Sequence, residues 1–243
     1  MFLDLLAYAG RVAPGLALIG AGAVLARPLR EPLLRIGLLI LGFILIRDAM
    51  TPTGLWRLGA EAGVLWVRFT DDAAVLVGFG AATLASTAAV LRFDPGLRAL
   101  VRWGPVRWRT IGLGLAGGAV AAAPLMAMSA GTGAGGPVAI SLLPALLWFS
   151  LTGNLAEEVL FRGFLQGRME SAVGPVRAAL FSAVCFAACH AFLASTVTDI
   201  GWPLLAFTLY EGVICAFLRL RWGVLPAALA HGLAIFLLAS GIF

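Results

Sequence analysis

Residues 137–166 read PVAISLLPALLWFSLTGNLAEEVLFRGFLQ, and this stretch guides the interpretation of the whole chain. As a helix it is long enough to cross a hydrocarbon core of ~30 Å. Its second half nevertheless carries Glu157, Glu158 and Arg162. Charged side chains are costly at membrane depth and usually serve a function there. The stretch therefore predicts a membrane helix that contains part of a functional site.

The composition of the chain extends this interpretation to a polytopic membrane protein. Hydrophobic residues make up 61% of the sequence and the mean hydropathy is +1.01, whereas soluble domains are only roughly half apolar. The apolar runs are continuous rather than alternating, so helices are favoured over a barrel as the structure that satisfies the backbone in lipid. We predict an all-α, polytopic transmembrane helical bundle with about eight spanning helices and one interfacial helix.

The apolar runs predict where the crossings lie. They cover residues ~5–26, ~32–49, ~72–92, ~110–130, ~137–166, ~175–195, ~201–219 and ~223–243. Residues 53–71 mix apolar and charged side chains, which suits an amphipathic helix in the membrane interface. We therefore divide the chain into residues 1–135, N-terminal transmembrane helices of unassigned role, and residues 136–243, a four-helix core that carries the acidic motif.

The basic residues predict the orientation. All 17 are arginines, and they give a net charge of +5. They gather in alternate predicted loops, which hold Arg27 and Arg30; Arg92, Arg98, Arg102, Arg107 and Arg109; Arg168 and Arg177; and Arg219 and Arg221. The positive-inside rule places these loops in the cytoplasm and both termini outside. The charge then serves topology and contact with membrane lipids rather than nucleic-acid binding. We expect an integral, multi-pass protein of a bacterial inner (plasma) membrane.

A polar ridge follows one face of the predicted fifth helix. Its members recur at i, i+4 spacing: Asn154, Glu158, Arg162 and Gln166. Such a ridge is expected to face the bundle interior because lipid penalises it. Glu158 and Arg162 are spaced to form an ion pair. Glu157 has Phe161 four residues further on and thus no such partner. An unpaired buried carboxylate is a candidate general base or acid, so we assign Glu157 a reactive role and Glu158 a structural one.

The chain contains two histidines, His190 and His231, and both lie in apolar runs. At ~1.5 Å per helical residue they and Glu157 fall well inside the membrane, within reach of the cytoplasmic face. A single histidine in a membrane helix is often an interhelical hydrogen bonder. Two of them at the depth of an unpaired glutamate favour one shared site around a water molecule. Glu211 is either a further member of this site or a helix–helix contact.

These residues resemble the CAAX protease and bacteriocin-processing (CPBP) family of intramembrane endopeptidases. The resemblance lies in three motifs: E-E-x-x-x-R at Glu157, Glu158 and Arg162; F-x-x-x-H at Phe186 and His190; and His231 in the last helix. It covers roughly residues 140–240, which makes residues 136–243 the expected catalytic core. The family implies hydrolysis of a peptide bond in a membrane-associated or lipidated protein or peptide. By resemblance, Glu157 and His190 activate water, His231 stabilises the oxyanion, and Arg162 holds Glu158.

The resemblance also bears on metal. Two histidines and a glutamate can bind zinc, so Glu157, His190 and His231 are the ligands if zinc is present. The family resemblance favours a glutamate-type mechanism without metal. We therefore expect no cofactor and keep zinc as the alternative.

One position departs from the family pattern. The residue four after His231 is usually asparagine or a similar polar residue, and here it is Ile235. Either His231 holds the oxyanion alone, Asn154 or another group contributes from a neighbouring helix, or catalysis is weak. The departure keeps open a non-catalytic membrane scaffold or immunity protein of the same fold. A proton-coupled transporter is the other alternative, because intramembrane Glu, Arg and His can relay protons.

Overall fold

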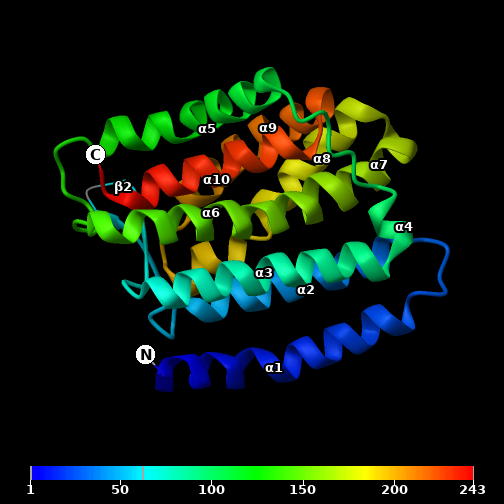
Figure 1. The fold of residues 1–243 in the computed structure, drawn as a ribbon, viewed down its shortest axis with the longest axis horizontal. Coiled ribbons are helices and arrows are strands. Elements are labelled where there is room, and N and C mark those ends of the chain that lie inside the picture. Colours follow the sequence, from blue (N-terminus) through cyan, green and yellow to red (C-terminus); the bar gives the residue numbers. More distant parts are fainter. Residues whose placement is uncertain (1, 62, 243) are drawn as a thin grey trace.

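The computed structural model describes residues 2–61 and 63–242. The chain forms long helices stacked side by side, with α5 at one side of the bundle and α1 at the other (Figure 1). The elements are α1 Phe2–Leu25, α2 Leu33–Met50, β1 Trp56–Glu61, β2 Val64–Phe69, α3 Ala73–Phe93, α4 Pro95–Arg98, α5 Trp108–Ser129, η1 Ile140–Leu142, α6 Leu143–Glu158, η2 Val159–Leu165, α7 Gln166–Val173, α8 Pro175–Ala188, η3 Leu193–Val197, α9 Trp202–Trp222 and α10 Val224–Ser240.

Within the described residues, five helices are long and apolar enough to cross a membrane. They are Leu3–Leu25, Ala73–Phe93, Trp108–Ser129, Pro175–Val197 and Trp202–Trp222. The prediction of a helical membrane bundle is confirmed at this level, but the count of about eight crossings is not. The other long helices lack the length or the apolar composition, because α2 and α6 carry charged residues and α10 has 17 residues.

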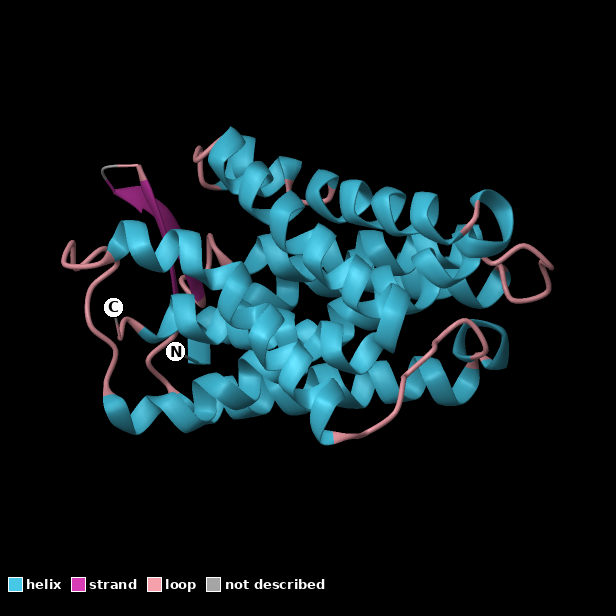
Figure 2. Cartoon of the chain, turned by 90° about the horizontal axis from the view of Figure 1, so that it is seen from above, coloured by secondary structure: helices cyan, strands magenta, loops and turns pink. Residues whose placement is uncertain are grey.

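The predicted interfacial helix over residues 53–71 is wrong. This segment forms an antiparallel hairpin in which Trp56 of β1 pairs with Phe69 of β2. The hairpin lies at one end of the helical bundle (Figure 2). Val64–Phe69 is rich in β-branched and aromatic residues, which favour strands. Gly63, at φ +81°, has the left-handed conformation that two-residue hairpin turns require. A mixed polar and apolar composition fits an amphipathic strand as well as an amphipathic helix.

The hairpin is anchored through Arg68, whose side chain is buried. Its guanidinium donates to the carbonyls of Gly136 (3.0 Å), Ala134 (2.9 Å) and Leu238 (3.0 Å). A further bond reaches its own neighbour Val67. One arginine therefore ties β2 to the loop that follows α5 and to the end of α10.

Small residues bring the central helices close together. α10 lies between α5 and α6 (Figure 1). A Cβ at Gly118 of α5 would lie 2.6 Å from the carbonyl oxygen of Ala230 of α10, so no side chain larger than hydrogen fits there. Close backbone approach at glycine is a usual way for membrane helices to pack. This packing places α10, with His231, in the middle of the bundle.

The helix that carries the acidic motif changes its winding directly after Glu158. α6 continues without a break into the π-helical turn η2 and then into α7. Wide turns of this kind inside helices often mark functional sites. The ridge residues Glu158, Arg162 and Gln166 are all fully buried across this turn, as expected for a polar ridge facing the bundle interior.

Candidate active site

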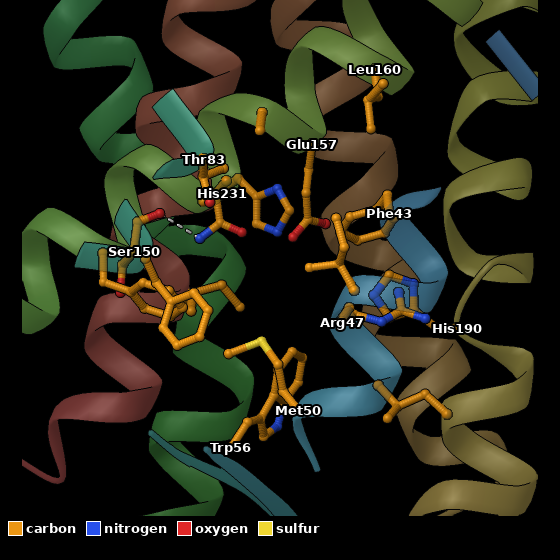
Figure 3. A pocket seen from close by; sticks show the side chains of 18 of the residues that line it. Phe43, Arg47, Met50, Trp56, Thr83, Ser150, Glu157, Leu160, His190 and His231 are labelled. Atoms are coloured by element: carbon orange, nitrogen blue, oxygen red, sulfur yellow. Dashed lines mark hydrogen bonds between the residues drawn. The ribbon is translucent and has the colours of Figure 1, made fainter. Parts of the chain in front are cut away.

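A cavity of about 730 Å³ lies inside the bundle and is lined mostly by apolar side chains. The three predicted catalytic residues, Glu157, His190 and His231, all line it. Figure 3 shows the Glu157 carboxylate pointing toward His231, with Arg47 and His190 near one another in another part of the cavity. The structure thus places one acid and two imidazoles, from three separate helical segments, along one cavity.

Glu158 lies at the centre of a buried polar cluster. Its Oε1 is 3.0 Å from Nη1 of Arg162 and 2.9 Å from Nδ1 of His231. The ion pair with Arg162 is the one that the i, i+4 spacing predicts. The contact with His231 joins α6 to α10 and was not predicted. A carboxylate only accepts hydrogen bonds, so Nδ1 of His231 carries the proton in this contact.

The ridge beyond Glu158 is held by the backbone of α9. Arg162 Nη2 donates to the carbonyl of Gly212 (3.0 Å), and Gln166 Nε2 donates to the carbonyl of Ala216 (3.2 Å). Because these carbonyls are four residues apart on α9, they match the spacing of the two donors. The polar ridge therefore locks the acidic helix against α9 and gives Glu157 and Glu158 a rigid support.

Glu157 differs from its neighbour. Among the described residues it has neither a hydrogen bond nor an ion pair, and its side chain is only partly buried because it faces the cavity. It interacts electrostatically with His231 and with Arg47 of α2. Glu157 is thus a carboxylate that a water molecule or substrate can contact, whereas Glu158 is bound to Arg162 and His231.

His190 follows the end of α8. Its Nδ1 lies 2.8 Å from the carbonyl of Phe186. Because a carbonyl only accepts, Nδ1 is the donor, and Nε2 of the neutral ring is left to accept a proton. The ring of Phe186 lies edge-on to both His190 (4.9 Å between centroids) and His231 (5.4 Å). The guanidinium of Arg162 lies over the same ring at 4.4 Å. Phe186 therefore packs the two histidines and the ridge arginine together.

A comparison with protein families matches the part of the chain that carries these residues. Residues 139–237 match the family model described as type II CAAX prenyl endopeptidase Rce1-like. This part of the chain is similar to the Rce1-like family. The Rce1-like segment runs from just before η1 into α10 and includes the acidic motif, both histidines and Phe186. No match was found among curated proteins or among solved structures.

The Rce1-like segment also contributes Glu211, whose role the sequence left open. Glu211 lies on α9, lines the cavity and is almost fully buried. Its Oε2 is 3.5 Å from Nε2 of His231. His231 thus lies between Glu158 on one nitrogen and Glu211 on the other. The sequence signal was present, since Glu211 is an isolated charge in an apolar run, but only the fold pairs it with His231.

Asn154 and Ile235 both lie in the Rce1-like segment and line the cavity. Asn154 Nδ2 donates to the carbonyl of Ser150 at 2.6 Å, one turn earlier on the same helix. An amide nitrogen carries two protons, so this bond leaves a second N–H on Asn154 for another acceptor. Ile235 offers no such donor. The polar group that α10 lacks is therefore available on α6.

The proposed zinc ligands do not gather into a metal site. Across residues 2–61 and 63–242, no three His, Cys, Asp or Glu side chains are grouped so that they could hold a metal ion. Nδ1 of each histidine is engaged, with Phe186 in one case and Glu158 in the other, so Nε2 is the ring nitrogen that a metal would use. The zinc alternative built on Glu157, His190 and His231 stays a prediction.

Arg47 is the cavity residue that the sequence analysis missed. It lies on α2, outside the Rce1-like segment, and is 3% exposed. Its Nη2 donates to the carbonyl of Cys189, the residue directly before His190, at 2.8 Å. The sequence shows Arg47 only as a charge near the end of an apolar run, which is also where topology-determining arginines occur. Its contact with α8 spans 142 positions in the chain, so no local pattern could reveal it.

Proposed function

We propose that this protein is an intramembrane endopeptidase that hydrolyses a peptide bond of a membrane-associated or lipidated protein or peptide. The observation that carries the proposal is that Glu157, His190 and His231 line one cavity within an Rce1-like segment. The type II CAAX prenyl endopeptidases of that family give the reaction class. The apolar lining of the cavity suits a substrate that is held in the membrane.

The reaction begins with water bound between Glu157 and His190. These groups take a proton from the water as its oxygen adds to the scissile carbonyl carbon. The carbonyl oxygen becomes an oxyanion, which His231 stabilises as a preorganised donor with Asn154 as the second donor. The tetrahedral intermediate then collapses, the C–N bond breaks, and the proton passes to the leaving amine. The products are a new carboxylate and a new amino terminus.

The surrounding residues support this division of labour. Glu158 orients the His231 ring through Nδ1, which leaves Nε2 as the nitrogen that donates to the oxyanion, and Arg162 neutralises Glu158 within the bundle. We assign the protein to a bacterial inner membrane as an integral, multi-pass protein whose cavity is reached from the cytoplasmic side. Three segments that lie among the arginine-rich loops support this orientation: the α1–α2 loop, the short helix α4, and α7. All three lie at one end of the bundle, opposite the hairpin (Figure 1).

The test is cleavage of a membrane-anchored fluorogenic peptide library by the purified protein in liposomes. We expect Glu157→Gln and His190→Ala to abolish cleavage while the protein stays folded. Glu61→Gln, a change on the exposed end of β1, is the matched carboxylate control and retains activity. Cleavage that persists in both active-site variants would refute the proposed reaction.

Ile235 favours one second candidate, a non-catalytic scaffold or immunity protein with the same bundle. In that case Glu157→Gln would keep the biological effect of the protein, because no reaction is needed. Loss of the effect in Glu157→Gln, with normal amounts of folded protein in the membrane, would exclude this candidate.

A further inference from the structure

Arg47 sits in a set of contacts that joins the N-terminal helices to the active site. Its Nε donates to Oδ1 of the neighbouring Asp48 at 2.7 Å. Its Nη2 donates to the carbonyl of Cys189 at 2.8 Å, and its Nη1 lies 3.7 Å from the sulfur of the same residue. The guanidinium also lies over the ring of Phe43 at 4.9 Å. Asp48 is buried as well, so the pair is shielded from solvent.

The carbonyl that Arg47 binds lies at the C-terminal end of α8. Cys189 caps the C-terminus of α8, and the chain turns at His190 before the π-helical segment η3. The last carbonyls of a helix lack partners within the helix, and a cation stabilises that end through the helix dipole. Arg47 therefore holds the backbone one residue before His190.

The guanidinium is not arranged as a receptor for a substrate anion. It is 3% exposed, and its donors already bind Asp48 and Cys189. What remains is a fixed cation in the cavity wall that interacts electrostatically with Glu157 and with His190. The contacts of Arg47 thus reach the backbone next to His190, and its charge acts on Glu157 and His190, the two groups that activate water in the proposed reaction.

We propose that Arg47, oriented by Asp48, is a positioning residue that fixes His190 for catalysis, so that α2 completes an active site whose other members lie in the Rce1-like segment. The inference rests on the proposed function for the role of His190. It gives residues 1–135 a part in the reaction, through one helix that reaches the end of α8.

The first test does not require activity. The chain has two histidines, so protein labelled at its histidine rings gives two sets of NMR signals, which His190→Ala and His231→Ala assign. We expect Arg47→Gln to shift the His190 signals more than those of His231. Arg47→Lys, which keeps a cation, moves them less. Asp48→Asn removes the carboxylate partner of Arg47 and leaves the guanidinium in place. We expect it to shift the His190 signals in the same way, and it provides the test if Arg47→Gln does not fold.

Arg35 provides the matched control. It lies on the same helix, is buried, and forms an ion pair with Asp94 at 2.8 Å, but it does not line the cavity. Arg35→Gln is expected to leave both histidine signals in place. This comparison separates loss of a buried ion pair on α2 from loss of the contact with Cys189.

The second test is kinetic. A misplacement of a catalytic group by about 1 Å can cost ~10²-fold in rate, so Arg47→Gln is expected to lower kcat by up to that factor with little change in KM, and Arg47→Lys to restore part of it. Unshifted His190 signals in folded Arg47→Gln would overturn the inference. If the signals shift but the wild-type protein cleaves no peptide, the positioning inference stands and the proposed function fails.

Discussion

Nδ1 of His231 lies 2.9 Å from Oε1 of Glu158, and the same carboxylate oxygen lies 3.0 Å from Arg162. One carboxylate therefore joins the acidic helix to α10 and neutralises a buried cation. Glu157, one residue earlier, faces the cavity instead. Two adjacent glutamates thus take different surroundings because their side chains lie on different faces of the helix.

Glu158→Gln is expected to destabilise the fold strongly. It leaves the guanidinium of Arg162, which is 0% exposed, without its counter-charge, and an uncompensated buried charge costs about 3–5 kcal/mol. Thermal unfolding in detergent measures the change. Glu157→Gln is the matched control, since it changes the adjacent residue without breaking an ion pair. Equal Tm values for the two variants would contradict the division of roles.

Ile235→Asn is expected to increase activity. It adds an amide to the face of α10 one turn after His231, and a single well-placed oxyanion donor is worth roughly 10²–10³-fold in kcat. Because Asn154 already supplies a donor in the proposed mechanism, we expect a gain nearer ~10-fold, mainly in kcat. Ile235→Leu keeps the apolar volume without a donor and serves as the control.

Asn154→Ala is expected to act in the opposite direction. It removes the donor from α6 and lowers kcat by about 10²-fold if that amide stabilises the oxyanion. The double variant with Ile235→Asn should recover part of the loss, because the donor then comes from α10. Steady-state kinetics of the single and double variants measure the coupling. Additive effects would show that the two positions do not share a role.

Arg68→Gln is expected to loosen the hairpin. The arginine donates to three carbonyls from distant segments, and hydrogen bonds to charged groups contribute about 1.5–3 kcal/mol each. We expect a lower Tm and faster proteolysis in the loop after α5. Arg57 lies directly across the hairpin from Arg68 but is exposed, so Arg57→Gln should change neither measurement. A loop equally protected in both variants would refute the anchoring role.

Chelators are expected to leave peptide cleavage intact. The described residues present no group of three His, Cys, Asp or Glu side chains arranged to hold a metal ion, and the proposed reaction uses Glu157, His190 and His231 directly. Cleavage rates with and without a strong zinc chelator measure this. Activity that is lost on chelation and restored by zinc would instead support the metal alternative.

A pH effect is expected at the connection between α1 and α2. Hydrogen bonds from Arg168 of α7 lower the pKa of Glu31. Because the folded pKa lies below the unfolded one, this stabilisation is present above the ordinary glutamate pKa of ~4.3 and is lost as pH falls through the folded value. The Tm difference between wild type and Glu31→Gln should therefore vanish at acid pH. The effect is small because the pair is exposed, and a difference that grows on acidification would contradict it.

The sequence predicts those features that depend on neighbours along the chain. The helical membrane class follows from long apolar runs, and the ion pair of Glu158 with Arg162 follows from four-residue spacing. Of the residues in the three motifs, Glu157, His190 and His231 line the cavity. The hairpin at 56–69 was missed because a mixed polar and apolar segment fits either an amphipathic helix or a strand, and its burial against α6 and α10 decides between them.

Composition and local spacing are enough to predict a helical membrane protein and the residue types that its site contains. Only the folded chain shows that Glu158 contacts His231, that Glu211 faces the same ring, and that Arg47 binds the end of α8. The hydrogen bond between Glu158 and His231 joins residues 73 positions apart, and the one between Arg47 and Cys189 joins residues 142 positions apart. Helix periodicity specifies which residues share a face, but only the packing of one helix on another specifies which faces meet.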